Sequence, residues 1–131
     1  MKNKPARRKI LVIDDERDLR EVMTELLETA GYRAISAANG ADGVRMNEQE
    51  NPDIIVLDLR MPGMDGIETL RRIREQDSGV SVVILTANGG AGTIREAAGL
   101  TVSEYLSKPF ENQEFIKLIG DLLWRQMVTR K

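Results

Sequence analysis

Residues 10–16, ILVIDDE, combine four consecutive apolar side chains with three acidic ones that follow directly. An uninterrupted apolar run of this length is typical of a strand buried on both faces of a parallel sheet. A helical pattern comes next, with apolar residues three and four positions apart from Leu19 through Val22 to Ala30, and with Gly31 as the expected C-terminal cap. A buried strand followed at once by an amphipathic helix indicates an α/β domain.

The same alternation continues to the end of the chain. Further strands are predicted over residues 33–37, 54–57, 82–85 and around 105–106. Further helices are predicted over residues 41–50, about 67–73, 93–98 and from Asn112, the expected N-cap, onward. Asn39-Gly40 is predicted as a turn, Asp65 as a helix-start carboxylate, and Gly66 as a permissive backbone position. Five strands alternating with five helices predict a doubly wound (βα)5 domain with a five-stranded parallel sheet. We place this domain at residues 9–126, after a basic lead at 1–8 and before a tail at 127–131.

The composition excludes several classes of function. The 131 residues fit one domain, and the absence of cysteine and histidine excludes disulfides, thiolate metal sites and every mechanism that uses an imidazole. A net charge of −2 offers no electrostatic reason to expect nucleic acid as the partner. No apolar run approaches the ~20 residues of a membrane span and no signal peptide is recognisable, so we expect a cytoplasmic protein without a membrane partner.

Polar residues follow four of the predicted strands, at the ends where such sheets bind ligands. Asp14 and Asp15 follow the first strand, Asp58 the third, Thr86 the fourth and Lys108 the fifth. Crowded carboxylates repel one another unless a cation neutralises them, and Mg²⁺ prefers such oxygen ligands. A carboxylate is also a nucleophile toward phosphorus, and Mg²⁺, an ammonium and a hydroxyl would together meet the oxygens of a phosphoryl group. The set therefore indicates phosphoryl transfer to a carboxylate.

Over about residues 9–124, the chain resembles the response-regulator receiver domain, the CheY-like family. The resemblance is carried by the acidic pair at 14–15, by VLDLRMPGMDG at 56–66 around the family's phosphoacceptor, by LTA at 85–87 with its switch hydroxyl, and by YLSKPF at 105–110. All four motifs occur in order and at the right spacing. The resemblance implies a flavodoxin-like fold with strand order 2-1-3-4-5.

The same resemblance implies a role for each matched residue of the site. Asp58 is expected to accept the phosphoryl group. Asp15 and Asp58 are expected to bind Mg²⁺ directly, together with the backbone carbonyl of Arg60, and Asp14 is expected to act through water. Lys108 is expected to bind the phosphoryl group.

Two further features concern the switch and the loop beside the site. Thr86 and Tyr105 are expected to move together on activation, with the ring turning inward. The Lys108-Pro109 peptide bond is expected to be cis, which is tolerable before proline.

The resemblance also implies partners. The phosphodonor is expected to be a histidine kinase or a histidine phosphotransfer protein, and the domain is expected to switch a downstream target, or an effector domain missing from this chain. We expect no enzyme activity beyond the domain's own phosphotransfer and dephosphorylation, no nucleic acid bound by this domain, and a homodimer as one outcome of phosphorylation. Met1 with its short lead favours a natural N-terminus over the C-terminal receiver of a hybrid kinase. A complete single-domain regulator and an N-terminal receiver both stay open.

The main alternative is a non-phosphorylated interaction module on the same fold, although such proteins usually lack part of the acid set that is complete here. A phosphatase of the haloacid-dehalogenase type needs a second aspartate two residues after its nucleophile, where this chain has Arg60. A flavin carrier would need a Ser/Thr-rich phosphate loop in place of the acids at 14–16, and the P-loop signature is absent.

One segment departs from the family pattern. Thr101-Val102 stand where receivers usually have Gly-Ala, and the loop 88–92 carries three glycines. One hypothesis is a short, loosely packed fourth helix that becomes ordered on phosphorylation. The other is an ordinary helix held to the sheet by Ile94, Ala97 and Leu100.

Overall fold

The computed structural model describes residues 7–60, 65–87, 100 and 102–129. Five strands form one sheet in the order β2-β1-β3-β4-β5, and every neighbouring pair is parallel. The strands are β1 (Lys9–Ile13), β2 (Arg33–Ala37), β3 (Ile54–Asp58), β4 (Ser81–Ala87) and β5 (Glu104–Lys108). The described helices are α1 (Arg17–Thr29), α2 (Gly40–Glu50), α3 (Gly66–Gln76) and α5 (Asn112–Thr129). The predicted doubly wound fold and its strand order are confirmed.

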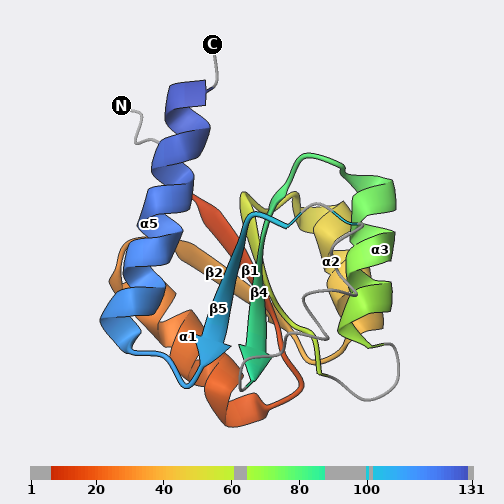
Figure 1. The fold of residues 1–131 in the computed structure, drawn as a ribbon, viewed down its shortest axis with the longest axis horizontal. Helices are drawn as coiled ribbons and strands as arrows, with labels where there is room; N and C mark the ends of the chain where they lie inside the picture. The colour runs from red at the N-terminus through yellow and green to blue at the C-terminus, as the bar shows by residue number, and fades with distance from the viewer. Residues whose placement is uncertain (1–6, 61–64, 88–99, 101, 130–131) are drawn as a thin grey trace, which may run out of the picture.

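The sheet lies between two layers of helices, α1 and α5 on one face and α2 and α3 on the other (Figure 1). The strands supply both cores, because successive side chains point to opposite faces. Ile10 and Val12 belong to the core beneath α1 and α5, whereas Leu11 and Ile13 belong to the core beneath α2 and α3. This division explains why the three central strands, β1, β3 and β4, carry consecutive apolar residues rather than alternating ones.

The segment after β3 is held to the start of α3 by a close backbone approach. A Cβ atom on Gly66 would overlap the Cα of Leu59, and the Gly66 amide donates to the Leu59 carbonyl at 3.1 Å. Gly66 is therefore required by space beside Leu59, not by the unusual backbone dihedral that the sequence suggested. Asp65 caps α3 as predicted, since its side chain accepts from the Glu68 amide at 2.9 Å.

Three local predictions need correction. Asn39 is not part of a free turn but the N-cap of α2, where its side chain accepts from the Asp42 amide at 2.8 Å. Asn112 is the first residue of α5 rather than its cap, because the Phe115 amide already donates to the Glu111 carbonyl. Val22 is 44% exposed, because it lies about 100° around α1 from the buried Met23.

The remaining element ends and the predicted fourth helix compare with the structure as follows. Gly31 follows α1 with φ of +99°, the left-handed value expected beyond a helix C-cap. α5 continues through Thr129, past the predicted domain boundary at residue 126. The predicted fourth helix at 93–98 falls outside the described residues, although Leu100 and Val102 pack against the core beneath α2 and α3. Within the described part of the chain, no helix is long and apolar enough to cross a membrane.

Candidate functional site

The polar residues of interest come from the carboxyl ends of neighbouring strands. Asp14 follows the last residue of β1, and Asp58 is the last residue of β3. Asp58 is in register with Leu85, the residue before Thr86 in β4, and Lys108 at the end of β5 is in register with Ala87. Because all these strands run parallel and are adjacent, their ends lie at one edge of the sheet, as predicted.

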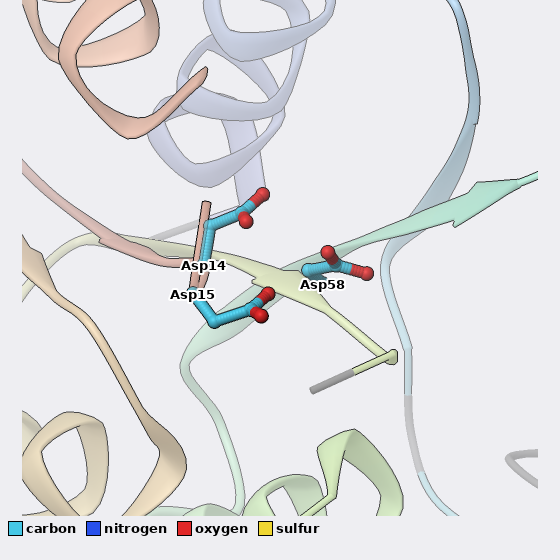
Figure 2. Close-up of side chains that lie close together, drawn as sticks. All are labelled: Asp14, Asp15 and Asp58. Atoms are coloured by element: carbon cyan, nitrogen blue, oxygen red, sulfur yellow. The ribbon is translucent and has the colours of Figure 1, made fainter. Parts of the chain in front are cut away.

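The three aspartates form a compact acidic cluster. Asp14, Asp15 and Asp58 each place a carboxylate oxygen within 4.8 Å of the others, and Figure 2 shows them projecting from the ends of β1 and β3. Asp14 is completely buried and Asp58 is 5% exposed, whereas Asp15 lies exposed at the rim. Three negative groups at this separation repel one another strongly where burial limits screening by water.

Lys108 is the one ammonium group that reaches this cluster among the described residues. Its Nζ lies 2.9 Å from Oδ2 of Asp58 and 3.7 Å from Oδ2 of Asp14. Burial alone would lower the pKa of Lys108, but the hydrogen bond to Asp58 and the charges of Asp14, Asp58 and Glu16 outweigh it, so the pKa is raised. Lys108 is therefore fully protonated at neutral pH and neutralises one of the three carboxylates.

The buried carboxylate of Asp14 is only partly satisfied. Its Oδ1 accepts from the Glu16 amide at 2.9 Å, whereas its Oδ2 has no hydrogen-bond partner among the described residues. Burial raises the pKa of Asp14, and the charges of Asp58 and Asp15 add to this, against the Glu16 hydrogen bond and the Lys108 charge. A buried oxygen without a donor favours a cation next to it.

The donor set fits a magnesium ion. Three carboxylates against one ammonium leave two negative charges uncompensated, which equals the charge of one divalent cation. Carboxylate oxygens are the ligands that Mg²⁺ prefers, and Oδ2 of Asp14 accepts no hydrogen bond from the described residues, its ion-pair partner Lys108 lying 3.7 Å away. Asp58 stays well oriented, because its Oδ1 accepts from the Arg60 amide at 2.9 Å while its Oδ2 accepts from Lys108.

Comparison with known proteins identifies the family. Residues 10–120 match the model of the response regulator receiver domain. The chain belongs to the response-regulator receiver family. This receiver is 38% identical over 106 residues to sporulation initiation phosphotransferase F of Bacillus subtilis, covering 81% of this chain and 86% of the relative. The family and fold implied by the sequence motifs are confirmed.

Two more relatives show where receivers of this kind occur. The chain is 36% identical over 121 residues to the transcriptional regulatory protein ResD of Bacillus subtilis. This match covers 92% of the chain but only 50% of ResD. It also resembles the solved receiver domain of a sensor histidine kinase from Pseudomonas aeruginosa, with a TM-score of 0.82, 31% identity, and coverage of 89% of this chain and 98% of that one. That structure was described with a magnesium ion coordinated in its active-site cleft.

The remaining predicted site residues lie around this edge of the receiver. Thr86 is buried, one position beyond the residue paired with Asp58. Tyr105 is half-buried in β5, in register with Ile84, and packs against the core beneath α2 and α3. The Arg60 side chain is exposed, and the Lys108-Pro109 bond is cis, as expected.

One contact at the site was not anticipated from the sequence. Arg20 on α1 is half-buried, and its Nη1 donates to the main-chain carbonyl of Asp14 at 2.9 Å. The spacing in the sequence is consistent with this contact, because Arg20 follows the acidic pair by about one and a half helical turns and can fold back over the strand end. Charged residues on an amphipathic helix usually face solvent, however, so the sequence offered no reason to single it out.

Proposed function

We propose that this receiver accepts a phosphoryl group on Asp58 from a histidine kinase or a histidine phosphotransfer protein, in a reaction that depends on Mg²⁺, and acts as a switch in a phosphorelay. The observation that carries the proposal is the position of Asp58 between two acidic neighbours and the Lys108 ammonium, 2.9 Å away. A carboxylate held in this way is oriented as a nucleophile, and the Lys108 ammonium can neutralise negative charge on the incoming phosphoryl group.

The transfer is a single displacement at phosphorus, in which Asp58 is the only residue of this protein that forms a covalent bond. An Asp58 oxygen attacks the phosphorus of a phosphohistidine, and the new O–P bond forms as the N–P bond breaks. The electron pair of the broken bond returns to the imidazole nitrogen of the donor. Lys108 then shifts its hydrogen bond from Oδ2 of Asp58 to a phosphoryl oxygen, and the Thr86 hydroxyl donates to another.

The acids supply the metal site in this proposal. Asp15 and Asp58 would hold Mg²⁺ together with the Arg60 carbonyl, with Asp14 acting through water. When bound, the ion would neutralise charge on a phosphoryl oxygen. The domain catalyses only its own phosphorylation and dephosphorylation, so it is a signalling component rather than a conventional enzyme.

Thr86 and Tyr105 would carry the conformational change that follows phosphorylation. Drawing the Thr86 hydroxyl toward the phosphoryl group frees space near Ile84 and Tyr105, which lie on the adjacent strands β4 and β5. The half-buried ring then turns inward and changes the surface beside β5. That surface would engage a target protein, an effector domain or a second copy of the chain.

The test measures intact mass after incubation with acetyl phosphate and Mg²⁺. We expect a gain of one phosphoryl group in the wild type, none in Asp58→Asn, and none in the wild type when EDTA removes the metal. An undiminished gain in Asp58→Asn would show that another residue accepts the group. A wild type that gains no mass with acetyl phosphate or with a phosphorylated histidine phosphotransfer protein would support the interaction-module alternative instead.

A further inference from the structure

Arg20 contacts the backbone of the acidic loop in a way that the proposed phosphotransfer does not use. Its Nη1 donates to the carbonyl oxygen of Asp14 at 2.9 Å, in a partly buried position. The Arg20 amide donates to the Glu16 carbonyl at 3.0 Å, so the residue belongs to the first hydrogen-bonded turn of α1. Its place in the first turn of α1 therefore brings the guanidinium within reach of the loop that precedes the helix.

The acceptor of this bond belongs to the peptide group that joins Asp14 to Asp15. Asp14 itself is held without Arg20, because its amide donates to Ala37 at 3.2 Å and its Oδ1 accepts from Glu16. The orientation of the following peptide group is set by two soft dihedral angles and decides where the next side chain points. A bond to the oxygen of that group restrains both angles.

Asp15 depends on this restraint more than the other two acids do. Its side chain is exposed, and no donor among the described residues bonds to its carboxylate. Asp58 is held by Arg60 and Lys108, and Asp14 by burial and the Glu16 amide. The position of the Asp15 carboxylate, within 4.8 Å of its neighbours, therefore depends on where the backbone directs its side chain.

We propose that Arg20 is a positioning residue that fixes the Asp14–Asp15 peptide group and so presents the Asp15 carboxylate to the acidic cluster. The proposal rests on the metal-dependent function above. Arg20 bonds to a neutral carbonyl, so we expect it to position Asp15 through this hydrogen bond rather than through the positive charge of its guanidinium. Loss of partners that orient metal ligands typically weakens metal binding 10–100-fold.

The test compares three variants that separate the hydrogen bond from the charge. Arg20→Met removes both, and Arg20→Lys keeps the charge, a donor and most of the reach. Arg17→Met removes one positive charge three residues earlier, at the first position of the same helix, where Arg17 pairs with Glu21 on the surface. We expect Mg²⁺ binding, measured by calorimetry on the unphosphorylated protein, to weaken about tenfold in Arg20→Met. Arg20→Lys should recover most of this loss, and Arg17→Met should bind like the wild type.

A second measurement needs no metal. The Asp15 N–H lies in the same plane as the Asp14 carbonyl, so its ¹⁵N order parameter reports the motion of that peptide group directly. We expect a rigid value near 0.85 in the wild type and a value approaching about 0.6 in Arg20→Met. Equal order parameters in the two proteins would overturn the proposal, even if the wild type bound no Mg²⁺. Equal losses of Mg²⁺ affinity in Arg20→Met and Arg17→Met would overturn it as well, because charge alone would then account for the effect.

Discussion

The Nζ of Lys108 lies 2.9 Å from Oδ2 of Asp58, although 50 positions separate the two residues in the chain. The strand order brings this contact about, because β4 is the single strand between β3 and β5. The lysine side chain therefore crosses the end of β4 to reach the carboxylate. Since Oδ2 of Asp14 lies 3.7 Å from the same nitrogen, one ammonium serves two buried acids.

Replacing Lys108 should separate phosphorylation from metal binding. We expect Lys108→Met to slow phosphorylation by acetyl phosphate about 10²-fold, because the transferring group loses its positively charged donor. Mg²⁺ affinity should not fall, since the ammonium is not a ligand and repels a second cation. Lys117→Met is the matched control, because Lys117 pairs with Asp121 on the exposed face of α5. Unchanged phosphorylation kinetics in Lys108→Met would contradict the role given to this residue.

The buried carboxylate of Asp14 should make the metal-free domain less stable at neutral pH. Burial raises the pKa of Asp14 above its value of 3.8 in the unfolded chain, so the folded state binds its proton more tightly. The destabilisation is therefore full above the folded pKa and disappears as the pH falls through that pKa toward 3.8. Asp14→Asn removes the charge, and we expect it to raise the free energy of unfolding at pH 7 by about 1 kcal/mol or more.

Urea denaturation at a series of pH values, without and with Mg²⁺, checks this expectation. The gain from Asp14→Asn should shrink as the pH is lowered, and it should shrink at pH 7 when Mg²⁺ neutralises the cluster in the wild type. A variant less stable than the metal-free wild type at pH 7 would show that the Asp14 carboxylate supports the fold instead.

The approach of α3 to the segment after β3 should be intolerant of a single methyl group. A Cβ on Gly66 would overlap the Leu59 Cα, so the backbone directly after Asp58 must shift. We expect Gly66→Ala to lower the free energy of unfolding by about 1–3 kcal/mol, the usual cost of forcing extra volume into a packed site. Gly79→Ala is the control, because the nearest atom to its added Cβ, an Asp77 oxygen, lies at an ordinary 3.7 Å. Equal unfolding midpoints for the two variants would rule out the steric explanation.

The last turns of α5 should contribute to the stability of the domain. The Gln126 side chain donates to the Asp53 carbonyl and to the Ser81 hydroxyl, each at 3.0 Å, which ties the helix to the starts of β3 and β4. We expect Gln126→Leu to cost about 1–3 kcal/mol, because it leaves these partners without their donor. Trp124→Ala on the same turn should change thermal stability little, since Trp124 is 62% exposed. Similar losses in both variants would show that the hydrogen bonds of Gln126 do not anchor the helix.

The amino-acid sequence predicted the architecture and the edge of the sheet that carries the site. Three apolar runs, at 10–13, 54–57 and 82–85, mark the central strands, because strands covered on both faces need apolar side chains at consecutive positions. The acids and the lysine stand at the carboxyl ends of predicted strands, and we expected them to lie close together because parallel strands end on the same side of the sheet. Two errors, at Asn39 and Asn112, lay at helix starts, where a turn and a cap share the same residue preferences. The third, at Val22, lay on the side of α1, where the apolar pattern did not define the edge of the buried face.

Contacts between individual side chains were decided only by the tertiary structure. Nothing in the order of residues indicates that Oδ2 of Asp14 finds no donor among the described residues, that Gly66 lies against Leu59, or that Arg20 turns back onto the Asp14 carbonyl. Each depends on distances between atoms that the sheet and its helices bring together from separate elements. The chemical types at the edge of a sheet are written in the sequence, whereas the hydrogen bonds among them require positions accurate to a few tenths of an ångström, which only the packed core provides.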